Sequence, residues 1–316
     1  MKPTHKESSF LHLYGPVPSR RLGFSLGVDI IPFKTCTLDC IYCQLGKTTK
    51  KTIQRREYFS PEKIVSQVKK ALSSGQHIDY ITFSGSGEPT LNTAIGKLIR
   101  EIKKLTSIPV AVLTNSTLLA RKSVRRALRG ADLVVPSVDA VTEEVFAAIN
   151  RPYHSLTAEG VVNGLREFRS EFKGEIWLEI MLVKGVNDSP LHIRKLKKVI
   201  SEIQPEKVQL NTVIRPPSEK SSRPLSRQEL EKIKEFLGKK CEIIAEFRRK
   251  EQFPPSEDIK ETILSMIKRR PVTLTDIFTS LGKQKNEIAK SLNGLLKDKK
   301  INRVVHKGLT YYRLRK

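Results

Sequence analysis

Three cysteines, Cys36, Cys40 and Cys43, stand within eight residues of one another and carry the clearest chemical signal in the chain. Thiolates bind zinc and iron–sulfur clusters, and three of them at this spacing can reach three corners of one cubane cluster. Structural zinc sites and most iron–sulfur clusters take four protein ligands. Three cysteines leave one iron open to a substrate or cofactor, so we expect a metal centre with a free coordination position.

Zinc bound by the three cysteines and one histidine is the alternative. No histidine lies within twenty residues of these cysteines in the sequence, which favours the cluster. The fourth cysteine, Cys241, lies 198 residues after Cys43 in an apolar segment, and we expect it to be a buried thiol. Four cysteines in 316 residues do not indicate a disulfide framework, so the expected compartment is reducing.

The length and composition are those of a globular protein. A chain of 316 residues suffices for one large domain and a small one. The N-terminal residues include no apolar core of a secretory signal, and no apolar stretch approaches the roughly 20 residues of a membrane span. We therefore expect a cytoplasmic protein without membrane contact.

The charge is strongly positive and unevenly distributed. The chain has 58 Lys plus Arg against 33 Asp plus Glu, a net charge of +25. Residues 255–316 contain fifteen of the basic and six of the acidic residues, a net charge of +9. Such a field attracts polyanions, so the basic C-terminal segment predicts a nucleic acid partner. Lysines on solvated helix faces are the alternative interpretation.

Strand-like and helix-like segments alternate through most of the chain. Expected strands are Val28–Ile31, Tyr80–Ser84, Val110–Thr114, Leu133–Val138, Ile176–Leu182 and Val208–Val213, with a further edge strand at Cys241–Phe247. Expected helices lie at 61–75, 93–105, 122–129, 142–149, 157–171, 190–203 and 226–237. The segment Tyr14–Asp29, rich in Pro, Gly and Ser, is expected to be a loop. Alternation of this kind predicts a parallel sheet with right-handed crossovers.

The fold class that follows is α/β: a partial (β/α)6 barrel with a small C-terminal winged-helix domain. We place the barrel at residues 1–252 and the basic small domain at 253–316, with a linker at Phe253–Ser256. In the residues after the linker, which we call the tail, the pattern predicts three helices: Glu257–Lys268, Thr275–Leu281 and Lys283–Leu296. Two strands follow at Asn302–His306 and Leu309–Leu314. A winged helix binds DNA in some proteins, and protein or RNA in others.

The cysteine spacing, with the aromatic Tyr42 before the last cysteine, resembles the signature of the radical S-adenosylmethionine (SAM) superfamily. The glycine–glutamate segment that ends the second strand also resembles a superfamily motif, through Gly85, Gly87 and Glu88. At finer scale, residues 15–23 and 43–46 resemble small iron–sulfur oxidoreductases related to the wyosine-base (tRNA) synthases. The resemblance covers roughly residues 20–250.

Two further strand ends carry weaker matches to the same superfamily. Asn115 lies in Thr-Asn-Ser, where the superfamily has Thr-Asn-Gly, and Ser137 and Asp139 resemble a polar pair near the cofactor ribose. The resemblance implies that Tyr42, the glycine–glutamate motif and these three residues bind SAM. It also implies that the three cysteines ligate a 4Fe–4S cluster.

The chemistry implied by the resemblance is reductive cleavage of SAM to methionine and a 5′-deoxyadenosyl radical, which takes hydrogen from a substrate. It requires a one-electron donor, a reductase or a protein of ferredoxin or flavodoxin type. The residues do not name the substrate, although RNA is favoured by the basic tail. The alternative function is a redox-sensing regulator that contains a cluster and binds DNA.

Arginines outside these motifs could hold an anion at the mouth of the barrel. Arg20 and Arg21 precede the first expected strand, and Arg215 follows the sixth. The guanidinium group binds carboxylates and phosphates with two parallel hydrogen bonds. Solvated arginines are the alternative at each of these positions.

Overall fold

A sheet of parallel strands forms the centre of the molecule. The structure, a computed structural model, describes residues 12–244, 259–281 and 285–315. The strand order in the main sheet is β1-β2-β5-β6-β7-β8-β9-β10. The strands are β1 (Leu13–Ser19), β2 (Gly23–Val28), β5 (Tyr80–Phe83), β6 (Val110–Thr114), β7 (Leu133–Pro136), β8 (Glu175–Leu182), β9 (Lys207–Thr212) and β10 (Cys241–Ile243). Neighbours from β2 onward are parallel, which confirms the predicted partial barrel.

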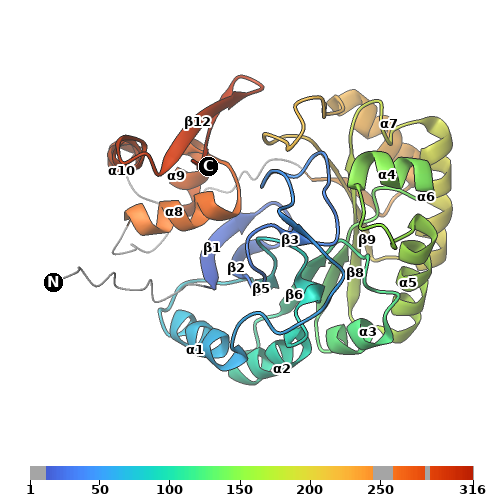
Figure 1. The fold of residues 1–316 in the computed structure, drawn as a ribbon, viewed down its shortest axis with the longest axis horizontal. Helices are drawn as coiled ribbons and strands as arrows, with labels where there is room; N and C mark the ends of the chain where they lie inside the picture. Colours follow the sequence, from blue (N-terminus) through green and yellow to red (C-terminus); the bar gives the residue numbers. More distant parts are fainter. Residues whose placement is uncertain (1–11, 245–258, 282–284, 316) are drawn as a thin grey trace.

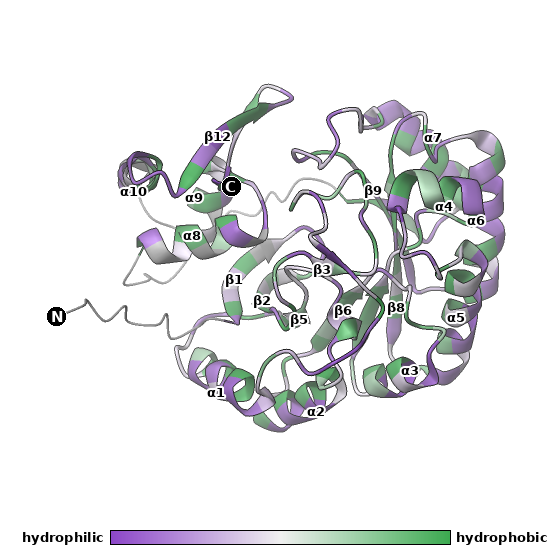
Figure 2. Ribbon diagram, in the orientation of Figure 1, coloured by the Kyte–Doolittle hydropathy of each residue, from purple (hydrophilic) through white to green (hydrophobic). Residues whose placement is uncertain are grey.

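The helices cover the outside of this sheet, as Figure 1 shows. They are α1 (Pro61–Leu72), α2 (Ile95–Leu105), α3 (Lys122–Leu128), α4 (Glu143–Asn150), α5 (Ala158–Glu171), α6 (Pro190–Ile203) and α7 (Arg227–Leu237). Helix α1 begins where its sequence predicts, because the Ser60 side chain accepts a hydrogen bond from the Lys63 amide and Pro61 takes the first helical position. Helices α1 and α2 carry both hydrophilic and hydrophobic residues along their length (Figure 2).

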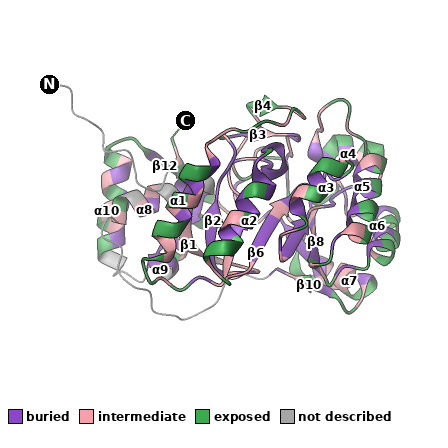
Figure 3. Ribbon diagram, turned by 90° about the horizontal axis from the view of Figure 1, so that it is seen from below, coloured by how far each residue is buried: buried purple, intermediate pink, exposed green. Residues whose placement is uncertain are grey.

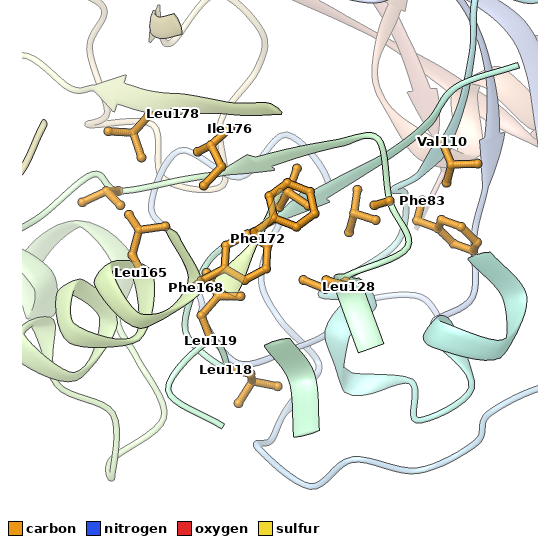
Figure 4. Packing of buried hydrophobic residues seen from close by; sticks show 14 of the residues in the cluster. Phe83, Val110, Leu118, Leu119, Leu128, Leu165, Phe168, Phe172, Ile176 and Leu178 are labelled. Atoms are coloured by element: carbon orange, nitrogen blue, oxygen red, sulfur yellow. The ribbon is translucent and has the colours of Figure 1, made fainter. Parts of the chain in front are cut away.

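The core lies between the strands and these helices. Strands β2, β6 and β8 are mostly buried, whereas the surrounding helices expose their outer faces (Figure 3). Phe168 of α5 and Phe172, which follows the helix, stack with ring centroids 4.7 Å apart, and both lie close to Ile176 of β8 (Figure 4). Each such buried side chain contributes about 1.5–3 kcal/mol by leaving water. The sheet that positions the site is therefore fixed by apolar packing.

The first two strands correct the sequence-based prediction, which made Tyr14–Asp29 a loop. This segment forms β1 and β2, an antiparallel pair joined by a short turn that contains Arg20 and Arg21. Strand β1 lies at the sheet edge, and its pairing is irregular between Tyr14 and Val17. Proline is tolerated at an edge or a bulge because its missing N–H breaks no central ladder.

The tail forms a separate packed unit. It contains α8 (Ile259–Arg269), β11 (Val272–Thr273), α9 (Leu274–Leu281), α10 (Lys285–Lys297), β12 (Ile301–His306) and β13 (Leu309–Leu314). Three helices and a hairpin therefore occur in the predicted order, and β13 pairs with both β11 and β12. The tail has its own core, which includes Ile288, Leu292 and Leu295 of α10. The predicted linker and the domain boundary at residue 252 lie outside the described residues.

The tail docks on the open edge of the barrel, beside β1 (Figure 1). Val17 of β1 packs against the core of the tail, and the Tyr311 hydroxyl donates a hydrogen bond to the Ile214 carbonyl over 2.9 Å. Within the described residues, no helix is long and apolar enough to cross a membrane.

Candidate functional site

One cavity of about 410 Å³ collects nearly all of the predicted site residues. Its wall includes the three cysteines and the side chains or backbone of six predicted cofactor-binding residues: Cys36, Cys40, Cys43, Tyr42, Gly85, Gly87, Glu88, Asn115 and Ser137. Arg20, Arg21 and Arg215, predicted to bind an anion, line the same cavity. These residues come from the ends and inner faces of different strands, where parallel sheets bind their ligands.

The loop that carries the cysteines is anchored to the sheet and to helix α4. Short strands β3 (Thr35–Cys36) and β4 (Lys50–Lys51) pair within it. The amides of Asp39 and Ile41 donate to the carbonyls of Asn150 and Ile149, at 2.9 and 3.0 Å. The last carbonyls of a helix have no partner inside the helix, so the cysteine loop satisfies the end of α4 while that end holds the loop.

Each cysteine sulfur receives one side-chain donor. Lys34 Nζ lies 3.1 Å from Cys43 Sγ, Asn150 Nδ2 lies 3.3 Å from Cys40 Sγ, and Asn115 Nδ2 lies 3.5 Å from Cys36 Sγ. Hydrogen bonds to ligating sulfurs stabilise the thiolate and tune the potential of a cluster.

Sequence reasoning missed Lys34 and Asn150. Lys34 is only two residues before Cys36, so its proximity to the cysteines was a usable signal. Asn150 is brought to Cys40 by the fold alone, since 110 residues separate them.

Two of the three thiols have a raised pKa. Burial, followed by the charge of Glu88, raises the pKa of Cys36 to about 11. Burial, followed by the charge of Asp139, raises the pKa of Cys40 well above its usual range. A bound metal centre supplies compensating positive charge and displaces thiol protons. Three half-buried thiols on one cavity wall, each with a side-chain donor, thus fit a cluster.

Gly85 and Gly87 let the second strand end dock against the cysteine loop. A Cβ atom on Gly87 would overlap the carbonyl oxygen of Thr35, next to Cys36. Gly85 has φ +143°, and a Cβ there would lie 2.5 Å from the Asp29 carboxyl carbon. The resemblance in the sequence assigned these glycines to SAM binding. The structure gives them a second role, which is close approach to the protein's own backbone and side chains.

Glu88 is 2% exposed and holds the neighbouring strand end in place. Its Oε1 accepts hydrogen bonds from the Thr90 amide and hydroxyl and from the Thr114 hydroxyl, and its Oε2 accepts one from the Asn115 amide at 2.7 Å. Burial raises the pKa of Glu88 against the opposing effect of these donors. Glu88 therefore fixes Asn115.

Asp139 is a buried carboxyl group that holds two residues near the cysteines. It is 4% exposed and is not part of the cavity wall formed by the described residues. Its carboxylate accepts hydrogen bonds from the Tyr42 hydroxyl, from Asn150 Nδ2 at 2.9 Å and from the Met181 amide at 2.9 Å. Asp139 therefore positions Tyr42 and Asn150, and its place beside the ribose stays a prediction.

The Thr-Asn-Ser departure from the superfamily pattern has a local explanation. Ser116 has φ +69°, the left-handed region that glycine adopts without strain. Its hydroxyl donates to the Ser137 carbonyl over 2.8 Å and so ties the ends of β6 and β7 together. Serine thus replaces glycine with a hydrogen bond that compensates part of the strain.

Basic residues line the same cavity as the cysteines. Arg21 donates two hydrogen bonds to Glu179, at 2.8 and 3.0 Å, inside the barrel. Burial alone would raise the pKa of Glu179, but the charge and hydrogen bonds of Arg21 outweigh it and lower the pKa. Arg20 donates to the Asn211 side-chain oxygen over 3.1 Å. The fold therefore brings these arginines together, and their binding of an anion stays a prediction.

One solved structure with a similar fold is a radical SAM enzyme. A radical SAM methyltransferase from Sphaerobacter thermophilus aligns with a TM-score of 0.52 and 19% sequence identity, over 69% of this chain and 65% of that chain. The family model named Radical SAM superfamily matches residues 30–196, just over half of the chain. The protein belongs to the radical SAM superfamily.

Closer relatives extend the match to the tail. A UPF0026 protein of Methanocaldococcus jannaschii is 37% identical over 95% of this chain and 94% of its own length. A protein of Brachyspira hyodysenteriae with the name GTPase Obg is 39% identical over 95% of this chain, but the chain spans only 45% of that relative.

Membership of the superfamily indicates an enzyme with a 4Fe–4S cluster and SAM as cofactors. The predicted cofactors are therefore confirmed, and a cluster replaces zinc as the interpretation of the three cysteines. Nothing in the comparisons points to a DNA-binding regulator. The finer resemblance to the wyosine-related group stays a prediction.

Proposed function

We propose that the protein cleaves SAM reductively at a cluster held by Cys36, Cys40 and Cys43, and modifies a substrate bound in the same cavity. One observation carries this proposal: the three cysteines, Glu88 and Asn115 line a single cavity inside the barrel. A radical must meet its substrate before it meets water, and one shared cavity meets that need.

Cys36, Cys40 and Cys43 would hold the cluster, which would supply the electron for reductive cleavage of SAM and, through that cleavage, hydrogen abstraction from the substrate. The protein's residues supply position. Lys34, Asn150 and Asn115 fix the three sulfurs, and Asp139 holds the Tyr42 ring on the cavity wall. Asn115 Nδ2 also donates to Thr37 over 2.8 Å, which limits its movement between two strand ends.

The partners of this reaction follow from its chemistry. A one-electron donor of ferredoxin or flavodoxin type, or a reductase, must deliver the electron. A nucleic acid partner for the tail is supported by its charge and by exposed lysines on α10, including Lys290 and Lys297. RNA is accordingly one substrate class for the proposed reaction.

The test is anaerobic production of 5′-deoxyadenosine. The full chain is reconstituted with iron and sulfide, and dithionite and SAM are added. The wild-type chain is expected to form 5′-deoxyadenosine, and Cys40→Ala is expected to fall to background. Cys241→Ala is the matched control, because Cys241 is a buried thiol of β10 away from the cavity wall.

Two outcomes would contradict the proposal. One is no 5′-deoxyadenosine from a wild-type chain whose 4Fe–4S content has been verified by iron and sulfide analysis. The other is equal production from wild type and Cys40→Ala, since the product would then arise without the proposed cluster.

A further inference from the structure

Four arginines that lie near one another line the cavity, and we call this part of its wall the arginine end. Arg20 and Arg21 come from the turn between β1 and β2, Arg215 follows β9, and Arg270 follows α8 of the tail. The acidic side chains in their described surroundings are Glu179 on β8 and Asp276 on α9. Four positive charges thus face two negative ones in a partly enclosed space.

The hydrogen bonds at this end leave part of the charge uncompensated. Arg21 and Glu179 form a two-fold hydrogen-bonded pair, at 2.8 and 3.0 Å. Arg20 donates to the neutral side-chain oxygen of Asn211. Asp276 comes only within 3.8 Å of the Arg215 guanidinium.

Arg215 carries the clearest sign of a missing partner. Its side chain is 11% exposed, and its Nε is buried without a hydrogen-bond partner among the described residues. A buried, unpaired donor on a charged group is costly unless a ligand meets it.

The pKa values agree with crowding of like charges. Burial, followed by the charge of Arg21, lowers the pKa of Arg20 to about 10. Burial, followed by the charges of Arg270 and Arg20, lowers the pKa of Arg215 well below its usual value. An anion placed between these groups would relieve the repulsion.

The tail completes this end of the cavity. Met266 and Arg270 belong to the wall, and α8 lies beside β1 at the open edge of the barrel (Figure 1). The Methanocaldococcus jannaschii relative aligns over 95% of this chain. The part of the chain outside the alignment is shorter than the tail, so that relative contains most of the tail as well. The tail is therefore part of the site wall in addition to being a basic surface.

We propose that the arginine end of the cavity binds a doubly charged anionic group of the substrate, a phosphate ester or a dicarboxylate. The proposal rests on the proposed function, because it makes the rest of the substrate point toward the cysteine end. Guanidinium groups match the paired oxygens of both anions. A cavity of about 410 Å³ is of small-molecule size.

The first experiment is calorimetric titration of the reconstituted full chain with inorganic phosphate, and separately with malonate. The wild-type chain is expected to bind one equivalent of one of them, and the tighter ligand identifies the anion class. Arg270→Gln should weaken that binding at least about tenfold, because it removes a charged donor. Arg303→Gln is the matched control: it removes one charge from an exposed position on β12 and should change the affinity less than about twofold.

A second variant separates geometry from charge. Arg215→Lys keeps the positive charge but loses the planar pair of donors, and it should weaken binding by about tenfold as well. Thermal unfolding supplies an independent readout, since the bound anion should raise the unfolding midpoint of the wild-type chain and of Arg303→Gln but not of Arg270→Gln.

Three results would overturn the inference: saturable binding of neither anion, equal binding by wild type and Arg270→Gln, or direct competition between the anion and SAM. Competition would mean that the arginines serve the cofactor. The anion titration is independent of SAM cleavage. Phosphate or malonate binding without 5′-deoxyadenosine production would therefore overturn the proposed function and leave the anion site standing.

Discussion

The two ends of the cavity are built in different ways. The three cysteines of the cysteine end come from one contiguous motif. Hydrogen bonds from uncharged side chains, such as those of Asn115 and Asn150 to the sulfurs, help to hold this end together. The arginine end is assembled from three distant segments, one of them in the tail, and an ion pair inside the barrel holds it. The cysteine triplet is thus local in sequence, while the arginine end depends on the whole fold.

The largest effect is expected at the arginine end, from Arg21→Met. It leaves the buried Glu179 carboxylate with the Asn211 amide as a remaining donor, at 3.1 Å, so the free energy of unfolding should fall by about 3–5 kcal/mol. Chemical denaturation measures the change, and the double variant Arg21→Met with Glu179→Leu should recover most of it.

The matched control for this prediction is Arg166→Met, which breaks a surface pair with Glu202 and should cost less than about 1 kcal/mol. A loss from Arg21→Met no larger than that of the control would show that the arginine end does not depend on its ion pair.

The cysteine end should respond to pH through Asp139. Burial raises the pKa of Asp139 to about 6, from 3.8 in an unfolded chain. The folded state therefore holds the proton more tightly, and this contribution to stability is full below about pH 4 and is lost as the pH rises through 6. Asp139→Asn does not titrate, so the difference in unfolding free energy between the two chains should change by roughly 2–3 kcal/mol over this range. A difference that is flat from pH 4 to 7 would contradict the assigned pKa.

Asn150 tests whether the donors to sulfur matter for the cluster. Asn150→Leu keeps the side-chain size but removes the donor to Cys40 and to Asp139. Loss of such an outer contact typically costs tenfold or more in metal affinity, so release of iron to a chelator should be about tenfold faster than from wild type. Asn163→Leu, on the exposed face of α5, is the control. Equal release from all three chains would show that the contact has no part in holding the cluster.

The smallest effect is expected at Ser116. Ser116→Gly relieves a left-handed conformation worth about 1–2 kcal/mol but loses the hydrogen bond to Ser137, worth about 1 kcal/mol. The net change in unfolding free energy should stay within about 1 kcal/mol, whereas Ser116→Ala keeps the strain and should be destabilising by about 1 kcal/mol. A glycine variant that is less stable than the alanine variant would contradict this explanation of the sequence departure.

The sequence predicted what depends on local patterns. Strand β6 was predicted at its observed bounds, and the cysteine triplet and Glu88 were found from their spacing. The sequence-based prediction was wrong for β1 and β2, because an edge strand can accept the Pro and Gly residues that usually indicate a loop. Asn150 and Arg270 carry no local signal. They reach the site only because α4 ends at the cysteine loop and α8 docks on β1.

The most direct test of the account is the electron paramagnetic resonance spectrum of the reduced cluster with and without SAM. Three cysteines leave one iron open within the cavity, so SAM is expected to change the spectrum of the wild-type chain, and Cys40→Ala is expected to show no such cluster signal. A wild-type chain with a full 4Fe–4S cluster, whose reduced spectrum is the same with and without SAM, would contradict the claim that this cavity binds SAM at the cluster.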